Sequence, residues 1–265
     1  MKRLVWFSAL CVAATSIFAV CENGKCSTPK AEAKCACAPC ACLACGCAAA
    51  PNTLSDAERA DGWKLLWDGK SGDGWRTVRN DQFPATGWVI RDGELTILSK
   101  KEEAKRPGDL ITKDKYANFA LKVDFKLTSG ANSGIKYFFN PSLNGGTTLE
   151  YQVLDELHPD AKLGHDGNRK VASFYDVMPA VGAQAKPVGE WNHAVIIAKG
   201  NHVEHWLNGK KVLEFERGSE EFRKAVSQSK FKKWANWGEQ KEGHILLQDH
   251  TDHVSYRNLK IKVLD

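Results

Sequence analysis

Alternating apolar and polar side chains predict that most of this chain forms β-strands. Between positions 119 and 127, large apolar residues alternate with Ala, Lys, Asp and Lys. A period of two places the apolar set on a buried face and the other set toward water. Further runs rich in apolar and β-branched residues are found at 135–139, 149–154, 193–198, 203–207, 211–215, 244–248 and 254–263.

Two dipeptides predict tight hairpins between such runs. Asp92-Gly93 interrupts one short apolar stretch, and Asn208-Gly209 separates two of the later runs. Both pairs readily adopt the positive φ angles that a two-residue hairpin turn requires.

One helix is expected late in the chain, at 220–234, because Phe222, Ala225 and Val226 fall on one side of it. Many short strands, frequent turn signals and this one short helix predict an all-β fold. We therefore expect a two-sheet antiparallel sandwich and place it at residues 61–265.

The N-terminus has the pattern of a signal peptide. Lys2 and Arg3 precede an apolar run at 4–20, which has the length of a signal-peptide core and is short for a membrane span. We predict an exported protein, periplasmic or at the cell surface, with a signal peptide at 1–20 and no transmembrane span after its removal. Cys21 is an alternative lipid-attachment site.

Cysteines are confined to the first part of the chain. All nine lie at or before Cys47, and the run from Cys35 to Cys47 is spaced mostly by Ala. Such spacing suits thiolate metal binding, whereas an oxidising compartment favours disulfides or cross-links between chains, and the sequence leaves both open. Because residues 21–60 contain few large apolar side chains, we predict a disordered tether there.

Composition excludes some function classes. The net charge is +5, and no compact Lys/Arg block is interleaved with aromatic residues, which argues against nucleic-acid binding. Motifs of serine hydrolases, P-loop proteins and HExxH proteases are absent from the sequence. Nine Trp residues offer flat apolar faces for sugar rings, or fill the core.

The segment 150–156 could carry acid/base chemistry. Glu150 and Gln152 share one face of a predicted strand, and Tyr151 takes the other. A bulge near Val153 would bring Asp155 to the face of Glu150. Paired carboxylates on a concave face suit acid/base work on sugars, but the pattern fits a solvated polar face equally well.

Two further segments contain candidate residues. Gln248 and His250 share one strand face, and a His beside carboxylates can act as a base, an acid or a metal ligand, or be structural. The small and polar residues of 129–134, with Asn132 among them, would let backbone approach a ligand closely, or form an ordinary loop.

These segments resemble the 3-keto-disaccharide hydrolase domain family of bacteria, which has a concanavalin- or laminarinase-like jelly-roll fold. The resembling stretches follow the family order at 62–69, 124–127, 132–135, 150–155, 187–192, 206–209 and 245–250. The family often has an Arg shortly after its Asn-Ser-Gly strand, where this chain reads Ile135-Lys136-Tyr137-Phe138-Phe139-Asn140. If that Arg contacts substrate, the substrate or the activity differs here.

The resemblance implies cleavage of glycosides oxidised at sugar carbon 3. A ketone at C3 acidifies the C2 proton, so that a base can start β-elimination of the aglycone from C1, and water can then add. Such a site needs a base, an acid and a group that stabilises the enolate, a role that suits one divalent metal ion of unknown identity.

Under this resemblance, the residues take roles by position. Glu150 or His250 is the base, and Asp155 or Glu150 assists the leaving group. The candidate ligands of the carbohydrate substrate are Gln152, Gln248 and Asn132, followed by Lys170 and His193.

Two other functions fit the same fold. The first is a non-catalytic carbohydrate-binding module, which would present exposed Trp residues and no clustered titratable groups. The second is a conventional laminarinase-type glycoside hydrolase, but its Glu-x-Asp-x-x-Glu pattern reads Glu150-x-Gln152-x-x-Asp155 here, with an amide in the middle. The enzyme hypothesis predicts that Glu150, Gln152, Gln248 and His250 converge in one cleft.

Overall fold

The computed structural model describes residues 21–22, 25–26, 50–143 and 148–265. The chain divides into two units, Met1–Ala49 and Ala50–Asp265. In the first, β1 (Cys21–Glu22) pairs with β2 (Lys25–Cys26) in antiparallel fashion. The predicted signal peptide and the run from Cys35 to Cys47 lie outside the described residues.

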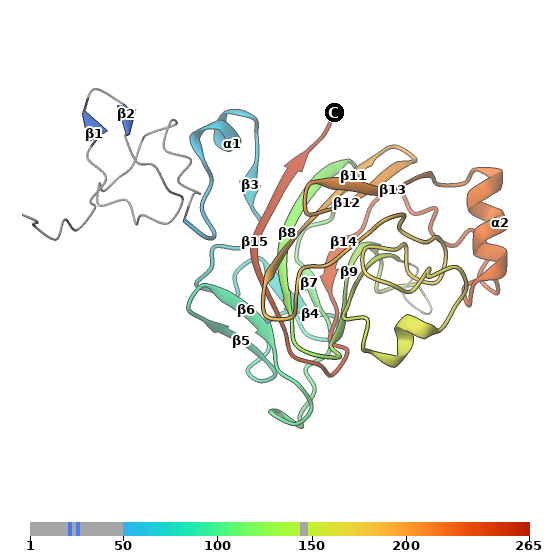
Figure 1. Ribbon diagram of the computed structural model, residues 1–265, viewed down its shortest axis with the longest axis horizontal. Coiled ribbons are helices and arrows are strands. Elements are labelled where there is room, and N and C mark those ends of the chain that lie inside the picture. Colours follow the sequence, from blue (N-terminus) through green and yellow to red (C-terminus); the bar gives the residue numbers. More distant parts are fainter. Residues whose placement is uncertain (1–20, 23–24, 27–49, 144–147) are drawn as a thin grey trace, which may run out of the picture. The chain divides into compact units, whose positions relative to one another are not determined.

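The second unit contains two antiparallel sheets (Figure 1). The larger sheet has the order β13 (Lys210–Glu216), β12 (His202–Leu207), β11 (Trp191–Lys199), β8 (Phe119–Leu127), β15 (Val254–Val263), β6 (Glu94–Ile97) and β5 (Trp88–Arg91), with β3 (Lys64–Leu65) beside β15. The smaller sheet has the order β10 (Leu149–Leu154), β9 (Asn132–Phe139), β14 (His244–Leu247), β7 (Leu110–Thr112) and β4 (Trp75–Thr77). The predicted all-β, two-sheet jelly-roll sandwich is confirmed.

The core lies between these sheets. On β8, Phe119, Leu121 and Phe125 are fully buried, as the period of two predicted. From the smaller sheet, Tyr151 packs on His205 of the larger one, with ring centroids 4.9 Å apart. The inward direction of Tyr151 fixes the outward direction of its neighbours on β10, and this positions the site described below.

Both predicted hairpin turns are present. Asp92 and Asn208 have φ angles of 52° and 50°, and the glycine after each has a positive φ as well. Each pair joins two adjacent antiparallel strands, β5 with β6 and β12 with β13.

The late helix is shorter than predicted. α2 spans Glu220–Gln228, with Ser219 as its N-cap, and buries Phe222 and Val226. It ends before 230–234 because Ser229 is extended and the next backbone N–H, of Lys230, donates to Asp176 Oδ2 at 2.7 Å.

The domain begins ahead of residue 61. Ser55 forms a capping box with Glu58 at the start of α1 (Asp56–Ala60). Glu58 binds Lys122 and Lys260 of β8 and β15 at 2.9 and 2.7 Å. These contacts attach a segment that composition alone assigned to the tether.

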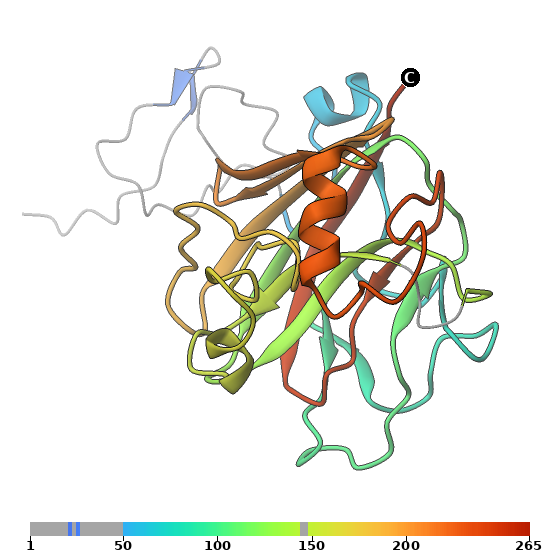
Figure 2. The same cartoon turned by 90° about the vertical axis from the view of Figure 1, so that its right-hand side faces the viewer.

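Two segments lie over the outer side of the smaller sheet. They are α2 with the residues after it, and the long connection after β10, which contains the 3₁₀ helix η1 (Pro159–Lys162). Figure 2 shows α2 and this connection, coloured yellow, on the same side of the sandwich. Among the described residues, no helix is both long and apolar enough to cross a membrane.

Candidate active site

A cavity of about 250 Å³ opens on the outer face of the smaller sheet. Its lining residues come from β9, β10, the end of β14 and the two covering segments: Asn132, Lys136, Thr148, Glu150, Gln152, Tyr175, Lys230, Phe231, Trp234, Gln248 and His250. Five of the residues proposed from sequence, Asn132, Glu150, Gln152, Gln248 and His250, therefore meet in one place.

Three hollows elsewhere are larger, at about 700, 460 and 340 Å³, the last of them beside β3. The first lies beside β13 and α2, and the second beside β6 and β15. In the second, Lys126 is already paired with Glu94 at 2.8 Å. None of these hollows gathers the candidate groups, so the smaller cavity is the better candidate for a site.

Strand register explains the convergence. On β9, Ser133 points inward, where its hydroxyl lies 2.6 Å from the hydroxyl of Tyr256. Asn132, Gly134 and Lys136 therefore point outward. Across the ladder, Glu150 is opposite Lys136.

Gly134 makes room for the Glu150 carboxylate. A Cβ at position 134 would collide with Glu150 Oε1, which lies over the glycine from the neighbouring strand. The φ angle of Gly134 lies outside the left-handed region, so the glycine is required for space rather than for backbone conformation.

The pKa of the Glu150 carboxyl group is raised. Burial raises its pKa above the ordinary value of 4.5, while the nearby Lys136 and Lys230 lower it and Asp109 raises it. Lys136 Nζ lies 3.6 Å from Glu150 Oε2. Burial also lowers the pKa of Lys230. The net effect is a carboxyl group that takes up a proton at a higher pH than a solvated one.

Two amide oxygens in the cavity wall have no partner in the described part of the chain. They are Asn132 Oδ1 and Gln248 Oε1, both buried. Leaving such an atom unpaired costs roughly 1–3 kcal/mol, so both are suited to accept hydrogen bonds from a ligand. Gln152 Oε1 accepts from the backbone N–H of Val153 at 3.2 Å.

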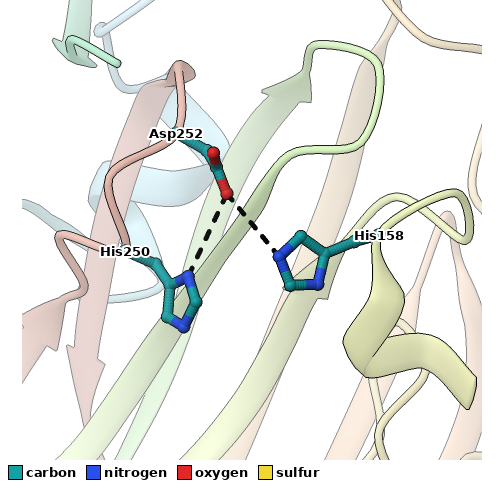
Figure 3. A group of neighbouring side chains, drawn as sticks. All are labelled: His158, His250 and Asp252. Atoms are coloured by element: carbon teal, nitrogen blue, oxygen red, sulfur yellow. Dashed lines mark ion pairs between the residues drawn. The ribbon is translucent and has the colours of Figure 1, made fainter. Parts of the chain in front are cut away.

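His250 lies at the edge of this cavity, with Asp252 and His158 beside it (Figure 3). The Asp249 carboxylate is bound by the Arg106 guanidinium and accepts from Gly108 N at 3.2 Å. This anchor fixes the loop that places His250.

Three residues proposed from sequence do not line the cavity. Asp155 Oδ2 instead accepts a hydrogen bond from Gly130 N at 2.6 Å. The expected bulge is absent from β10, because this strand is in regular register with β9 through Leu154. His193 is on β11 of the other sheet, 2.7 Å from Asp124. Lys170 is half exposed and contacts Glu156 at 3.5 Å.

Several lining residues were not proposed from sequence. Lys136 could have been found, because it lies two positions after Gly134 on the same strand face. Lys230, Trp234 and Tyr175 come from irregular segments whose path over the sheet has no periodic signal.

The residues of this site lie within a recognised sequence family. The family described as "3-keto-alpha-glucoside-1,2-lyase-like domain" matches residues 62–262. The chain belongs to this family. The resemblance noted in the sequence is thus confirmed.

Relatives agree with this membership. A protein of Bacteroides thetaiotaomicron named "3-keto-disaccharide hydrolase" is 35% identical over 291 residues and covers 100% of both chains. A crystal structure of a putative glycosyl hydrolase from Parabacteroides distasonis is 29% identical, with a TM-score of 0.70, over 82% of this chain and 100% of that one. A second from the same organism is 27% identical, with a TM-score of 0.57, over 72% and 99%. Together these similarities support a carbohydrate hydrolase.

Proposed function

We propose that this protein cleaves glycosides that carry a ketone at C3 of the sugar, and that it does so by β-elimination. The observation that carries the proposal is the composition of the cavity. Among the described residues that line it, Glu150 is the only carboxylate, and two lysines flank it.

A conventional retaining or inverting glycosidase uses two carboxyl groups on opposite sides of the glycosidic bond. Gln152 replaces one of them here, and Asp155 lies outside the cavity. Elimination does not require two carboxyl groups of the protein, because the substrate's own ketone acidifies the C2 proton. One carboxylate can then serve twice where the C2 proton and the C1 oxygen lie on the same face of the ring, as in a β-glucoside.

The electron flow follows from this arrangement. Glu150 removes the C2 proton, and the electron pair moves into a C2–C3 enolate whose charge is on the C3 oxygen. The enolate then re-forms the C3 ketone and a C1–C2 double bond, while the C1–O bond breaks. Protonated Glu150 returns its proton to the departing oxygen, so the enzyme regains its starting state. Addition of water across the double bond yields the free 3-keto sugar.

The other groups support these steps. Lys136 and Lys230 supply positive charge beside the base, where the enolate develops. Asn132, Gln152 and Gln248 offer amide groups to sugar hydroxyls, and the indole of Trp234 offers a flat face to the ring. Such clustered titratable groups disfavour the carbohydrate-binding module. The apolar run at 4–20 supports the further proposal that the protein acts after export.

The test is aglycone release from a chromogenic 3-keto glucoside and from its unoxidised parent. We expect release from the ketone alone, and slower release when C2 carries deuterium. Equal release from the parent glucoside without an isotope effect would contradict elimination.

A variant identifies the base. Glu150→Gln keeps the shape but cannot accept the proton, so we expect turnover to fall by about 10²- to 10⁴-fold. The exposed Glu190→Gln is the matched control and should leave turnover unchanged.

A further inference from the structure

Two histidines and a carboxylate meet at the edge of the cavity. His158 is the N-cap of η1, whereas His250 and Asp252 belong to the loop between β14 and β15. His158 Nε2 lies 3.9 Å and His250 Nδ1 lies 4.0 Å from Asp252 Oδ2. Figure 3 shows both rings turned toward this one oxygen.

We propose that His158, His250 and Asp252 bind one divalent first-row metal ion, which keeps open positions for sugar oxygens. Two imidazoles and one carboxylate are a ligand set that holds such ions while leaving sites free for substrate. The binding of the ion is independent of the proposed function; its contact with a 3-keto sugar rests on it.

The geometry is close to that of a metal site. Ligand atoms that share an ion at about 2.1 Å lie roughly 3.0–3.4 Å apart, and the three candidate ligand atoms here lie within 4.8 Å of one another. Side-chain rotations that move the ligand atoms by about 0.5–1 Å would bring the two histidine nitrogens to that distance from Asp252 Oδ2. His250 is nearly half exposed and has room to move.

His158 adds a condition. Its Nδ1 accepts from Asp160 N at 3.1 Å, which places the imidazole proton on Nε2. Ligation through Nε2 moves that proton to Nδ1, so this contact must open when the ion binds. We therefore expect an affinity below that of a preformed site.

The residue that contacts Asp252 has a side-chain oxygen without a partner in the ranges that the structure describes. Asn132 is 2% exposed, and its Oδ1 has no partner among the described residues. The same residue donates its backbone N–H to Asp252 Oδ2 at 3.0 Å, so it orients a candidate metal ligand. A bound ion, or water held by it, would supply the missing partner.

A second group of His and Glu residues provides a contrast. His202, Glu204 and Glu214 also come together, at β12 and β13 of the larger sheet. Lys211 already pairs with both of these carboxylates, and His202 is paired with Glu216 at 2.7 Å, which makes His202 a matched control.

The ion would supply what elimination needs beside Glu150. A divalent cation with free positions can polarise the C3 ketone and stabilise the enolate oxygen. His158, His250 and Asp252 would then act by holding the ion, and His250 would not be the base.

Binding is tested by adding Mn²⁺ to the full chain and measuring the electron paramagnetic resonance signal of the free ion, which falls as the ion binds. Mn²⁺ suits the test because the thiolates of the N-terminal cysteines prefer softer metals. We expect one ion per chain, with affinity at least 10-fold lower in each of His158→Gln, His250→Gln and Asp252→Asn, and unchanged in His202→Gln. No binding, or binding that these three variants leave unaltered, would overturn the site. Circular dichroism verifies that each variant is folded.

A second readout separates this site from the proposed function. Adding 3-keto glucoside to the Mn²⁺-loaded Glu150→Gln variant should lower the relaxation rate of water protons, since sugar oxygens displace water bound to the ion. Unchanged relaxation contradicts the contact between metal and sugar. If the chain binds no Mn²⁺ but still cleaves the 3-keto glucoside in EDTA, the metal site is wrong and the proposed function stands. If the chain binds Mn²⁺ but does not cleave the 3-keto glucoside, the metal site stands and the proposed function is wrong.

Discussion

Glu150 combines burial with two neighbouring cations, and these act on its pKa in opposite directions. Burial raises the pKa, and Lys136 holds part of that rise back. The base must be ionised, so kcat/KM should fall as the pH drops through a pKa above 4.5, the ordinary value.

Lys136→Met tests this balance. Removing the positive charge raises the pKa of Glu150 further, so the acidic limb of the kcat/KM profile should move to higher pH. The maximum rate should also fall, because charge beside the enolate is lost. Lys115→Met, at an exposed position, serves as the control. An acidic limb that stays in place would show that another group titrates.

Gly134→Ala should reduce activity without unfolding the protein. The added methyl group pushes the Glu150 carboxylate aside, and we expect kcat/KM to fall about 10- to 100-fold, as misplaced catalytic groups do. Stability should change by less than about 1 kcal/mol, because the backbone suits alanine. In a Glu150→Gln background the same change should have little further effect.

The alternation of side chains explains how much of the site the sequence could predict. Glu150 and Gln152 were found because a strand period of two assigns them to one face, whereas Asn132 was proposed from the small and polar residues of 129–134. The structure places all three on the cavity side. The same period could have identified Lys136. Asp155 was misplaced because the prediction required a bulge that β10 does not have.

At the scale of elements, length decides what could be predicted. β8, with nine residues, has a clear period, and both two-residue turns were identified by their glycines. β4 and β7 have three residues each, too few for a period to appear. The end of α2 depends on Asp176, which is distant in sequence and gives no local signal.

Substitution of Asp176 can therefore test whether the segment after α2 shapes the cavity. It is 4% exposed, accepts from Lys230 N at 2.7 Å and pairs with Arg169 at 2.6 Å. Asp176→Asn weakens both contacts, which frees the segment that contains Lys230 and Trp234.

We expect KM for the 3-keto glucoside to rise more than kcat falls, together with a loss of roughly 1–3 kcal/mol in stability. Asp166→Asn, at an exposed position nearby, should alter neither. A loss of stability with unchanged KM would mean that this segment does not shape the site.

At the scale of the whole molecule, a neutral histidine joins the two sheets. His205 Nδ1 donates to the carbonyl of Ala172 at 2.8 Å, so Nε2 accepts from the hydroxyl of Tyr137 at 2.8 Å. Burial lowers the pKa of His205 from 6.5 to about 4. The unfolded chain therefore takes up this proton at a higher pH than the folded one.

Stability should consequently fall as the pH drops from about 6.5 toward about 4. Between pH 7.5 and 5 the contribution of His205 amounts to about 2 kcal/mol, measured by urea unfolding at both pH values. His205→Gln should lose this part of the pH dependence, while the share from other histidines stays. Equal pH dependence in both proteins would assign the effect elsewhere.

The attachment of residues 50–60 has a practical consequence. Glu58 binds Lys122 and Lys260, whose side chains leave the outer face of the larger sheet. The cavity opens on the outer face of the smaller sheet, which is the opposite layer. Substitutions in residues 50–60 would therefore act on the layer away from the cavity.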